Sequence, residues 1–153
     1  MKVVSNTGPI IGLAKIGKLS LLQQMTGEVL IPPYVHRELF GKIGSEAEHI
    51  QSALATFIRI VDIPPVTPDV EKTLADIDEG EKQAVVLARG EGQDVLLLLD
   101  DRAGREAAAR LGIPTTGLVG LLLLAKEKGL ITGVGTLIEE LEPHRVRSIL
   151  FDF

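Results

Sequence analysis

Short apolar runs alternate with amphipathic segments along the chain. The run Val95-Leu96-Leu97-Leu98-Leu99 is followed at once by Asp100-Asp101. A run this short and this apolar is typical of a strand that is buried on both faces of a parallel sheet. Residues 2–5 predict a second such strand, which leads into Asn6 and Thr7.

Strands and helices alternate over most of the sequence. Further strands are predicted over 28–31, 58–61 and 113–115, and residues 145–153 fit either a late strand or an extended tail. Helices are predicted over 7–16, 19–25, 33–40, 45–57, 67–75, 78–88, 102–111, 117–128 and 136–141. Thr7 can cap the first of these helices and Gly17 can end it, and a capping box at Ser45 opens the helix over 45–57. This alternation predicts an α/β protein, and we expect a single three-layer α/β/α domain over residues 1–153, with a central parallel sheet.

Polar residues follow the carboxyl ends of two predicted strands. If strands 2–5 and 95–99 are neighbours, Asn6, Asp100 and Asp101 share one crevice at the sheet edge, where α/β proteins bind ligands. With Glu38 and Glu81 they form an oxygen-rich set of the kind that Mg²⁺ or Mn²⁺ prefers. Clustered carboxylates need a cation, a basic partner or shifted pKa values. A metal site is therefore our leading hypothesis.

Each of these residues also has a structural interpretation. Asp101 can cap the alanine-rich helix that follows it, and Asp78-x-x-Glu81 fits a capping box. Glu38 can be a solvated helix residue, and Asn6 can be an ordinary turn or cap residue. Capping needs only one of the two aspartates, which favours a functional role for Asp100 or Asp101. The pattern favours neither interpretation for Glu81, and the structural interpretation is the more common one for Glu38 and Asn6.

Composition narrows the choice of function. The 16 basic and 21 acidic residues give a formal net charge of −5, which argues against binding nucleic acid by bulk positive charge. Cysteine is absent, which excludes disulfides and thiolate sites. The sequence also lacks a GxxxxGK loop, which argues against an NTPase. The chain opens without a signal peptide pattern, and its longest apolar stretch, 118–125, is too short to span a bilayer. We therefore expect a cytoplasmic protein without a membrane segment.

Several motifs occur in an order that resembles a known family. They are Val4-Ser5-Asn6-Thr7-Gly8-Pro9-Ile10-Ile11-Gly12-Leu13-Ala14-Lys15-Ile16-Gly17, Val29-Leu30-Ile31-Pro32, Val35-His36-Arg37-Glu38-Leu39, Asp78-Glu79-Gly80-Glu81-Lys82-Gln83-Ala84, Leu98-Leu99-Asp100-Asp101-Arg102, Leu111-Gly112-Ile113-Pro114, Thr116-Gly117 and Leu124-Ala125-Lys126. Together they resemble the PIN-domain-like proteins of the DUF3368 group over residues 3 to about 131. Each motif is modest alone, and their order and spacing make the match specific.

The resemblance implies a function. It implies a Mg²⁺- or Mn²⁺-dependent ribonuclease, the toxin of a toxin–antitoxin pair, that acts as a homodimer and binds a small antitoxin protein. Its acidic positions map onto Asn6, Glu38, Glu81 and Asp101, with Asp100 adjacent. Asp101 and Glu38 would be metal ligands, Glu81 and Asp100 would be ligands or orient the attacking water, and Asn6 would ligate weakly or hold a water.

Two departures from the family pattern matter. PIN nucleases usually have aspartate where this chain has Asn6, so the site has one negative charge fewer and should bind metal more weakly. Many also carry aspartate at the position of Glu81, although the longer side chain can still ligate. The alternative is therefore a weak or inactive PIN-like module that binds RNA or a partner protein. A receiver-type signalling domain is disfavoured, because it needs an acidic pair where this chain has Ser5-Asn6.

Overall fold

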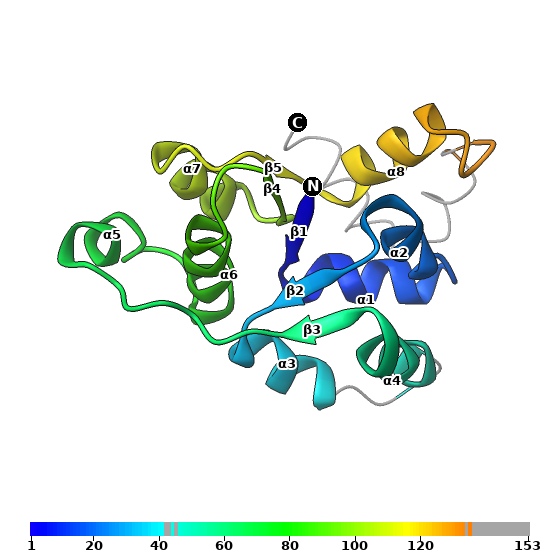
Figure 1. Ribbon diagram of the computed structural model, residues 1–153, viewed down its shortest axis with the longest axis horizontal. Helices are drawn as coiled ribbons and strands as arrows, with labels where there is room; N and C mark the ends of the chain where they lie inside the picture. The colour runs from blue at the N-terminus through cyan, green and yellow to red at the C-terminus, as the bar shows by residue number, and fades with distance from the viewer. Residues whose placement is uncertain (42–43, 45, 134, 136–153) are drawn as a thin grey trace.

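The computed structural model describes residues 1–41, 44, 46–133 and 135 (Figure 1). In this part of the chain a parallel five-stranded sheet has the order β3-β2-β1-β4-β5. Its strands are β1 (Lys2–Ser5), β2 (Val29–Ile31), β3 (Ile58–Ile60), β4 (Val95–Leu98) and β5 (Thr115–Thr116). The predicted α/β class with a central parallel sheet is confirmed. Strands β1 and β4 are paired, which meets the condition for a site shared by Asn6, Asp100 and Asp101.

The side chains of adjacent strand residues alternate between the two faces of the sheet. In β1, Val3 belongs to one buried cluster and Val4 to the other. In β4, Leu98 joins the cluster of Val3, whereas Leu97 joins that of Val4. Because β1 and β4 are apolar on both faces, both faces must be covered by helices.

Helices supply that cover. They are α1 (Thr7–Lys15), α2 (Ser20–Thr26), α3 (Pro33–Phe40), α4 (Glu46–Thr56), α5 (Pro68–Thr73), α6 (Glu79–Gly90), α7 (Arg102–Arg110) and α8 (Leu118–Glu127). Residues of α1, α2, α4 and α8 pack in the cluster with Val3, and residues of α5, α6 and α7 pack in the cluster with Val4 (Figure 1). Helix α3 contacts both α1 and α6, so it links the two helical layers.

Helix starts follow the expected chemistry at two places that bear on the site. Asp78 caps α6 by accepting a hydrogen bond from Glu81 N (2.8 Å), as the capping box predicts. Asp101 caps α7 by accepting a hydrogen bond from Ala103 N (2.9 Å). Both caps fix the backbone immediately next to candidate site residues.

Two local predictions were wrong. Thr7 is the first residue of α1 rather than its cap, because the extended backbone of Asn6 places that residue at the N-cap position, and the Thr7 hydroxyl donates to Glu38 Oε1. Strand β5 begins at Thr115 rather than at Ile113, because Ile113 N donates to Ala108 O at the end of α7. The Ser45 cap, the helix predicted over 136–141 and the open segment 145–153 lie outside the described residues.

Candidate metal centre at the carboxyl edge of the sheet

The candidate residues gather where the strand order reverses. Strand β1 pairs with β2 on one side and with β4 on the other, and β4 continues to β5. The chain therefore continues to opposite faces of the sheet after these two strands, and α/β proteins bind ligands at such a point. Asn6 N donates to Leu98 O (3.0 Å), so the residue after β1 is tied to the end of β4.

Asn6 and Glu38 meet beside the start of α6. A Cβ atom placed on Gly80 would lie 2.9 Å from Glu38 Oε1 and 3.3 Å from Asn6 Oδ1, so both oxygens approach the same point. Thr7 donates to Glu38 Oε1 (2.7 Å) and thereby holds this carboxylate beside the end of β1. Asn6 Oδ1 is buried and accepts no hydrogen bond. A buried carbonyl oxygen without a partner is costly, which makes Asn6 Oδ1 a candidate ligand for a cation.

Glu81 is the buried carboxyl group of this edge, with 5% of its surface exposed. Burial, followed by hydrogen bonding and charge repulsion from Asp78 and then from Asp101, raises the pKa of Glu81 to about 9. Its Oε2 atom has no hydrogen-bond partner and would lie 2.9 Å from a Cβ on Gly104 of α7. The raised pKa favours the neutral form of Glu81 at pH 7, and a nearby cation would favour its ionised form.

Asp101 fulfils the capping role and also lies within electrostatic reach of Glu81. The hydrogen bond to Ala103 N uses Oδ1, and a carboxylate has a second oxygen with further acceptor capacity. Asp101 is exposed, so a ligand can reach it from solvent. Capping and ligation are thus compatible at this position.

Asp100 is oriented toward β5 and α8. Its Oδ1 accepts a hydrogen bond from Leu118 N (2.8 Å) in the first turn of α8. Arg105 donates to the carbonyl oxygens of Leu99 (3.1 Å) and Asp100 (2.6 Å). These contacts give Asp100 and Arg105 a role in holding the loop that carries Asp101.

The oxygen ligands at this edge are of the type that binds a hard divalent cation, but their side chains are not arranged around one point. Among the described residues, no three His, Cys, Asp or Glu side chains already converge on one point. Two buried oxygens without partners, Asn6 Oδ1 and Glu81 Oε2, nevertheless face this edge, and Glu38 and Asp101 lie beside them. Carboxylate and amide oxygens are the ligands that Mg²⁺ and Mn²⁺ prefer, so these residues fit such an ion.

Several residues of the edge are difficult to recognise from sequence. Gly80 and Gly104 look like ordinary helix glycines, although a side chain at either position would press on Glu38 or Glu81. Arg105 looks like a free surface cation, although its guanidinium is bound to backbone carbonyls. The feature of the sequence that could have indicated this part of the site is the Gly80-Glu81 pair, which closely follows the Asp78 cap.

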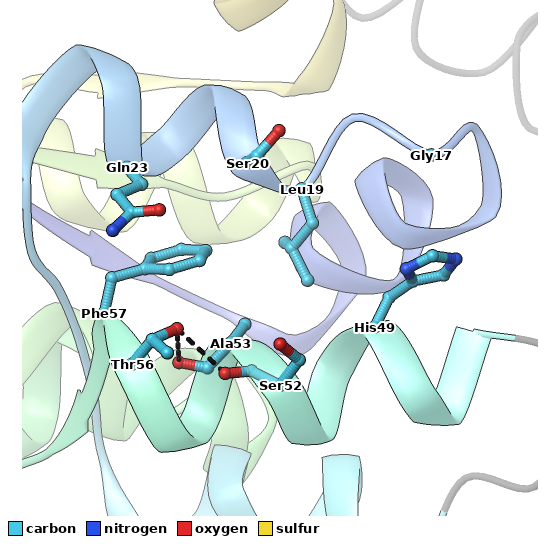
Figure 2. Close-up of a pocket in the computed structure, with 9 residues that line it drawn as sticks. All are labelled: Gly17, Leu19, Ser20, Gln23, His49, Ser52, Ala53, Thr56 and Phe57. Carbon is cyan, nitrogen blue, oxygen red and sulfur yellow. Dashed lines mark hydrogen bonds between the residues drawn. The ribbon is translucent and has the colours of Figure 1, made fainter.

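A separate pocket of about 300 Å³ lies between the α1–α2 turn and α4 (Figure 2). Its lining has hydroxyl, amide and imidazole groups but no carboxylate: Gly17, Leu19, Ser20, Gln23, His49, Ser52, Ala53, Thr56 and Phe57. The Thr56 hydroxyl donates to Ser52 O (2.8 Å), so its hydrogen is used inside its own helix. This pocket therefore lacks the chemistry of the acidic edge.

The parallel sheet, its helical layers and the acidic strand ends define the class of PIN-like α/β/α domains. The family model DUF3368, described as a PIN domain, matches residues 2–149, and the chain belongs to this family. PIN domains are generally nucleases and are typically dependent on divalent metal ions.

A solved structure supports the fold. It is a PilT N-terminus domain protein from the hyperthermophilic archaeon Sulfolobus solfataricus P2, with a TM-score of 0.55 and 19% sequence identity, and the match covers 83% of this chain and 95% of that one. No curated protein matches the chain. Within the described residues, every helix is too short or too polar to cross a lipid bilayer.

Proposed function

We propose that the protein is a Mg²⁺- or Mn²⁺-dependent endoribonuclease whose site consists of Asn6, Glu38, Glu81, Asp100 and Asp101. The observation that carries this proposal is the pair of buried, unpartnered oxygens, Asn6 Oδ1 and Glu81 Oε2, at the point where the strand order reverses. Buried polar atoms in proteins are nearly always hydrogen-bonded, so two unpartnered oxygens at one edge of the sheet support a role in binding a cation.

Asn6, Glu38, Glu81 and Asp101 would hold the ion, and a bound divalent ion would supply Lewis-acid polarisation of the phosphate and a more acidic water. Thr7 fixes the Glu38 carboxylate through its 2.7 Å hydrogen bond. Glu81 starts as a neutral acid and can release its proton when the edge gains positive charge. Asp100 holds the loop of Asp101, or orients the attacking water.

The wider biological role follows from the resemblance to toxin-type PIN proteins. In this proposal the chain is the toxin of a toxin–antitoxin pair, acts in the cytoplasm as a homodimer, and is inhibited by a small antitoxin protein. RNA is the substrate because PIN domains are associated with RNA binding. The acidic net charge of −5 means that RNA must be recruited by local contacts near the site.

The test is cleavage of an end-labelled single-stranded RNA in Mn²⁺, in Mg²⁺ and in EDTA. We expect metal-dependent cleavage by the unchanged protein, and a loss of at least a hundredfold in Asp101→Asn. The matched control is Asp94→Asn, because Asp94 precedes the same strand β4 at the opposite edge of the sheet and is exposed. Equal cleavage by Asp101→Asn and Asp94→Asn would overturn the assignment of the site.

A second candidate function is a non-catalytic module that binds RNA or a partner protein. The uncharged Asn6 favours it, because an amide contributes less to cation binding than a carboxylate does. Absence of cleavage by the purified protein under all three conditions, together with retained RNA binding, would support this candidate. Appearance of cleavage in Asn6→Asp would then show that one missing carboxylate separates the two functions.

A further inference from the structure

We propose that Tyr34 and Arg37 of α3 form a stacking platform that holds an unpaired base of single-stranded RNA beside the acidic edge. The inference rests on the proposed function for its substrate class, and it adds the contact that recognises the strand. Its basis is the position of the Tyr34 ring next to Gly80, the point that Asn6 and Glu38 approach, and of the Arg37 guanidinium over that ring.

Tyr34 lies directly against the candidate metal centre. Its ring atom Cδ1 would be 3.3 Å from a Cβ on Gly80, the same point that lies 2.9 Å from Glu38 Oε1. The backbone around the ring is fixed, because Tyr34 N donates to Gln83 Oε1 (3.1 Å) and Gln83 Nε2 donates to Glu79 Oε1 (3.0 Å). These bonds hold the Tyr34 backbone against α6, with the ring beside Glu38.

Arg37 extends this ring toward solvent. Its Cζ atom lies 5.3 Å from the centroid of the Tyr34 ring, which is within the range of a cation–π contact. Arg37 is exposed, and in the described part of the chain the Tyr34 ring is its interaction partner while no carboxylate pairs with it. One face of the guanidinium can thus rest on the ring while the other face meets a ligand.

This arrangement fits an RNA base together with its phosphate. Proteins recognise unpaired RNA bases by stacking them on aromatic rings or on guanidinium planes. The positive charge of Arg37 also attracts the adjacent phosphate, which offsets the repulsion from Glu38 at its side. A base-paired nucleotide cannot offer its free face without being unstacked, so the platform selects single strands.

The experiment measures binding of a short single-stranded RNA that carries 2-aminopurine at successive positions. It uses the full chain with Asp101→Asn to suppress cleavage, and it is run in Mg²⁺ and in EDTA. Arg37→Met is compared with Arg110→Met, because Arg110 is also exposed and also lies in the last turn of its helix. Arg37→Lys keeps the charge and removes the planar group, and circular dichroism confirms that each variant is folded.

We expect Arg37→Met to weaken binding about tenfold and to change 2-aminopurine fluorescence at one position, since stacking contributes about this much per base. Arg37→Lys should recover part of the affinity but not the fluorescence change. Equal affinities of Arg37→Met and Arg110→Met would overturn the platform, and so would a full rescue by lysine or an equal loss with double-stranded RNA. Because binding is measured without turnover, the platform can be confirmed even if the protein fails to cleave RNA.

Discussion

Asn6 is the uncharged member of the candidate set, and its environment shows what one carboxylate would change. Its Oδ1 atom is buried without a partner and approaches the same point as Glu38 Oε1. In the absence of metal, a carboxylate here would add a charge close to Glu38 and would be destabilising. With a cation bound, the same charge would become favourable.

We therefore predict that Asn6→Asp lowers the melting temperature in EDTA and binds Mn²⁺ at least tenfold more tightly than the unchanged protein. Thermal unfolding with and without Mn²⁺, and titration calorimetry, measure both effects. The two changes should have opposite signs because they arise from the same charge. An Asn6→Asp variant with unchanged Mn²⁺ affinity would contradict the placement of residue 6 in the metal site.

Glu81 gives a prediction on pH. Its folded-state pKa of about 9 lies above the ordinary value of 4.5, so between these values the folded state binds more protons than the unfolded state. The free energy of unfolding in EDTA should then fall as pH rises from about 4.5 to 9. Each pKa unit corresponds to about 1.4 kcal/mol, so a difference of this size corresponds to a decrease of roughly 6 kcal/mol.

Glu81→Gln should remove most of that decrease, since glutamine resembles the neutral acid and does not ionise. Urea unfolding at pH 5, 7 and 9 in EDTA compares the two proteins. We expect similar stability at pH 5 and a clear advantage for the variant at pH 9. A parallel pH dependence in both proteins would mean that another group controls it. The matched control is Glu79→Gln, an exposed glutamate in the same helical turn.

At the scale of elements, the loop from β4 to α7 is held by backbone contacts as well as by its acids. Arg105 donates to the carbonyl oxygens of Leu99 and Asp100, and Asp100 Oδ1 accepts from Leu118 N. These bonds connect the end of β4 to the starts of α7 and α8. A loop tied at three places keeps the Asp101 carboxylate at the crevice.

These contacts predict different roles for Asp100 and Asp101, which substitutions can distinguish. Asp100→Asn keeps an oxygen that can accept from Leu118 N, so we predict less than a threefold loss of Mn²⁺ affinity. Asp101→Asn should reduce the affinity at least tenfold. Arg105→Met should destabilise the fold by about 1–3 kcal/mol, because it leaves partly buried carbonyl groups unpaired. A loss in Asp100→Asn equal to that in Asp101→Asn would show that Asp100 is itself a ligand.

Element boundaries and the sheet were largely predictable from the sequence, for physical reasons. The apolar run at 95 and the caps at Asp78 and Asp101 are local signals, and the structure confirms them. The start of β5 was not predictable, because Ile113 N is used by the end of α7 through a contact that periodicity does not encode. The side-chain partners of Thr7 and Arg105 depend on tertiary contacts in the same way.

At the scale of the whole molecule, the candidate site lies at the ends of central strands of the sheet, which are paired on both sides and covered by helices. Strands β1 and β4 each have a paired strand on both sides and helices on both faces. Strand β3 lies at an edge, where Ile60 is 45% exposed. Residues that project from β1 and β4 are therefore positioned by the most constrained backbone of the protein.

This difference predicts a gradient of hydrogen exchange. Hydrogen-bonded amides at the core of a fold exchange only through global unfolding, whereas those at an edge exchange through local opening. We expect the amides of Val4 and Leu97 to show protection that approaches the free energy of global unfolding, and the amides of β3 to exchange earlier. Measurement by native-state exchange in low denaturant gives the order directly.

Because the site depends on β1 and β4, Mn²⁺ should slow exchange at Asn6 and Glu81 while leaving β3 unchanged. Faster exchange in β1 than in β3 would contradict this view and would place the site on a mobile element.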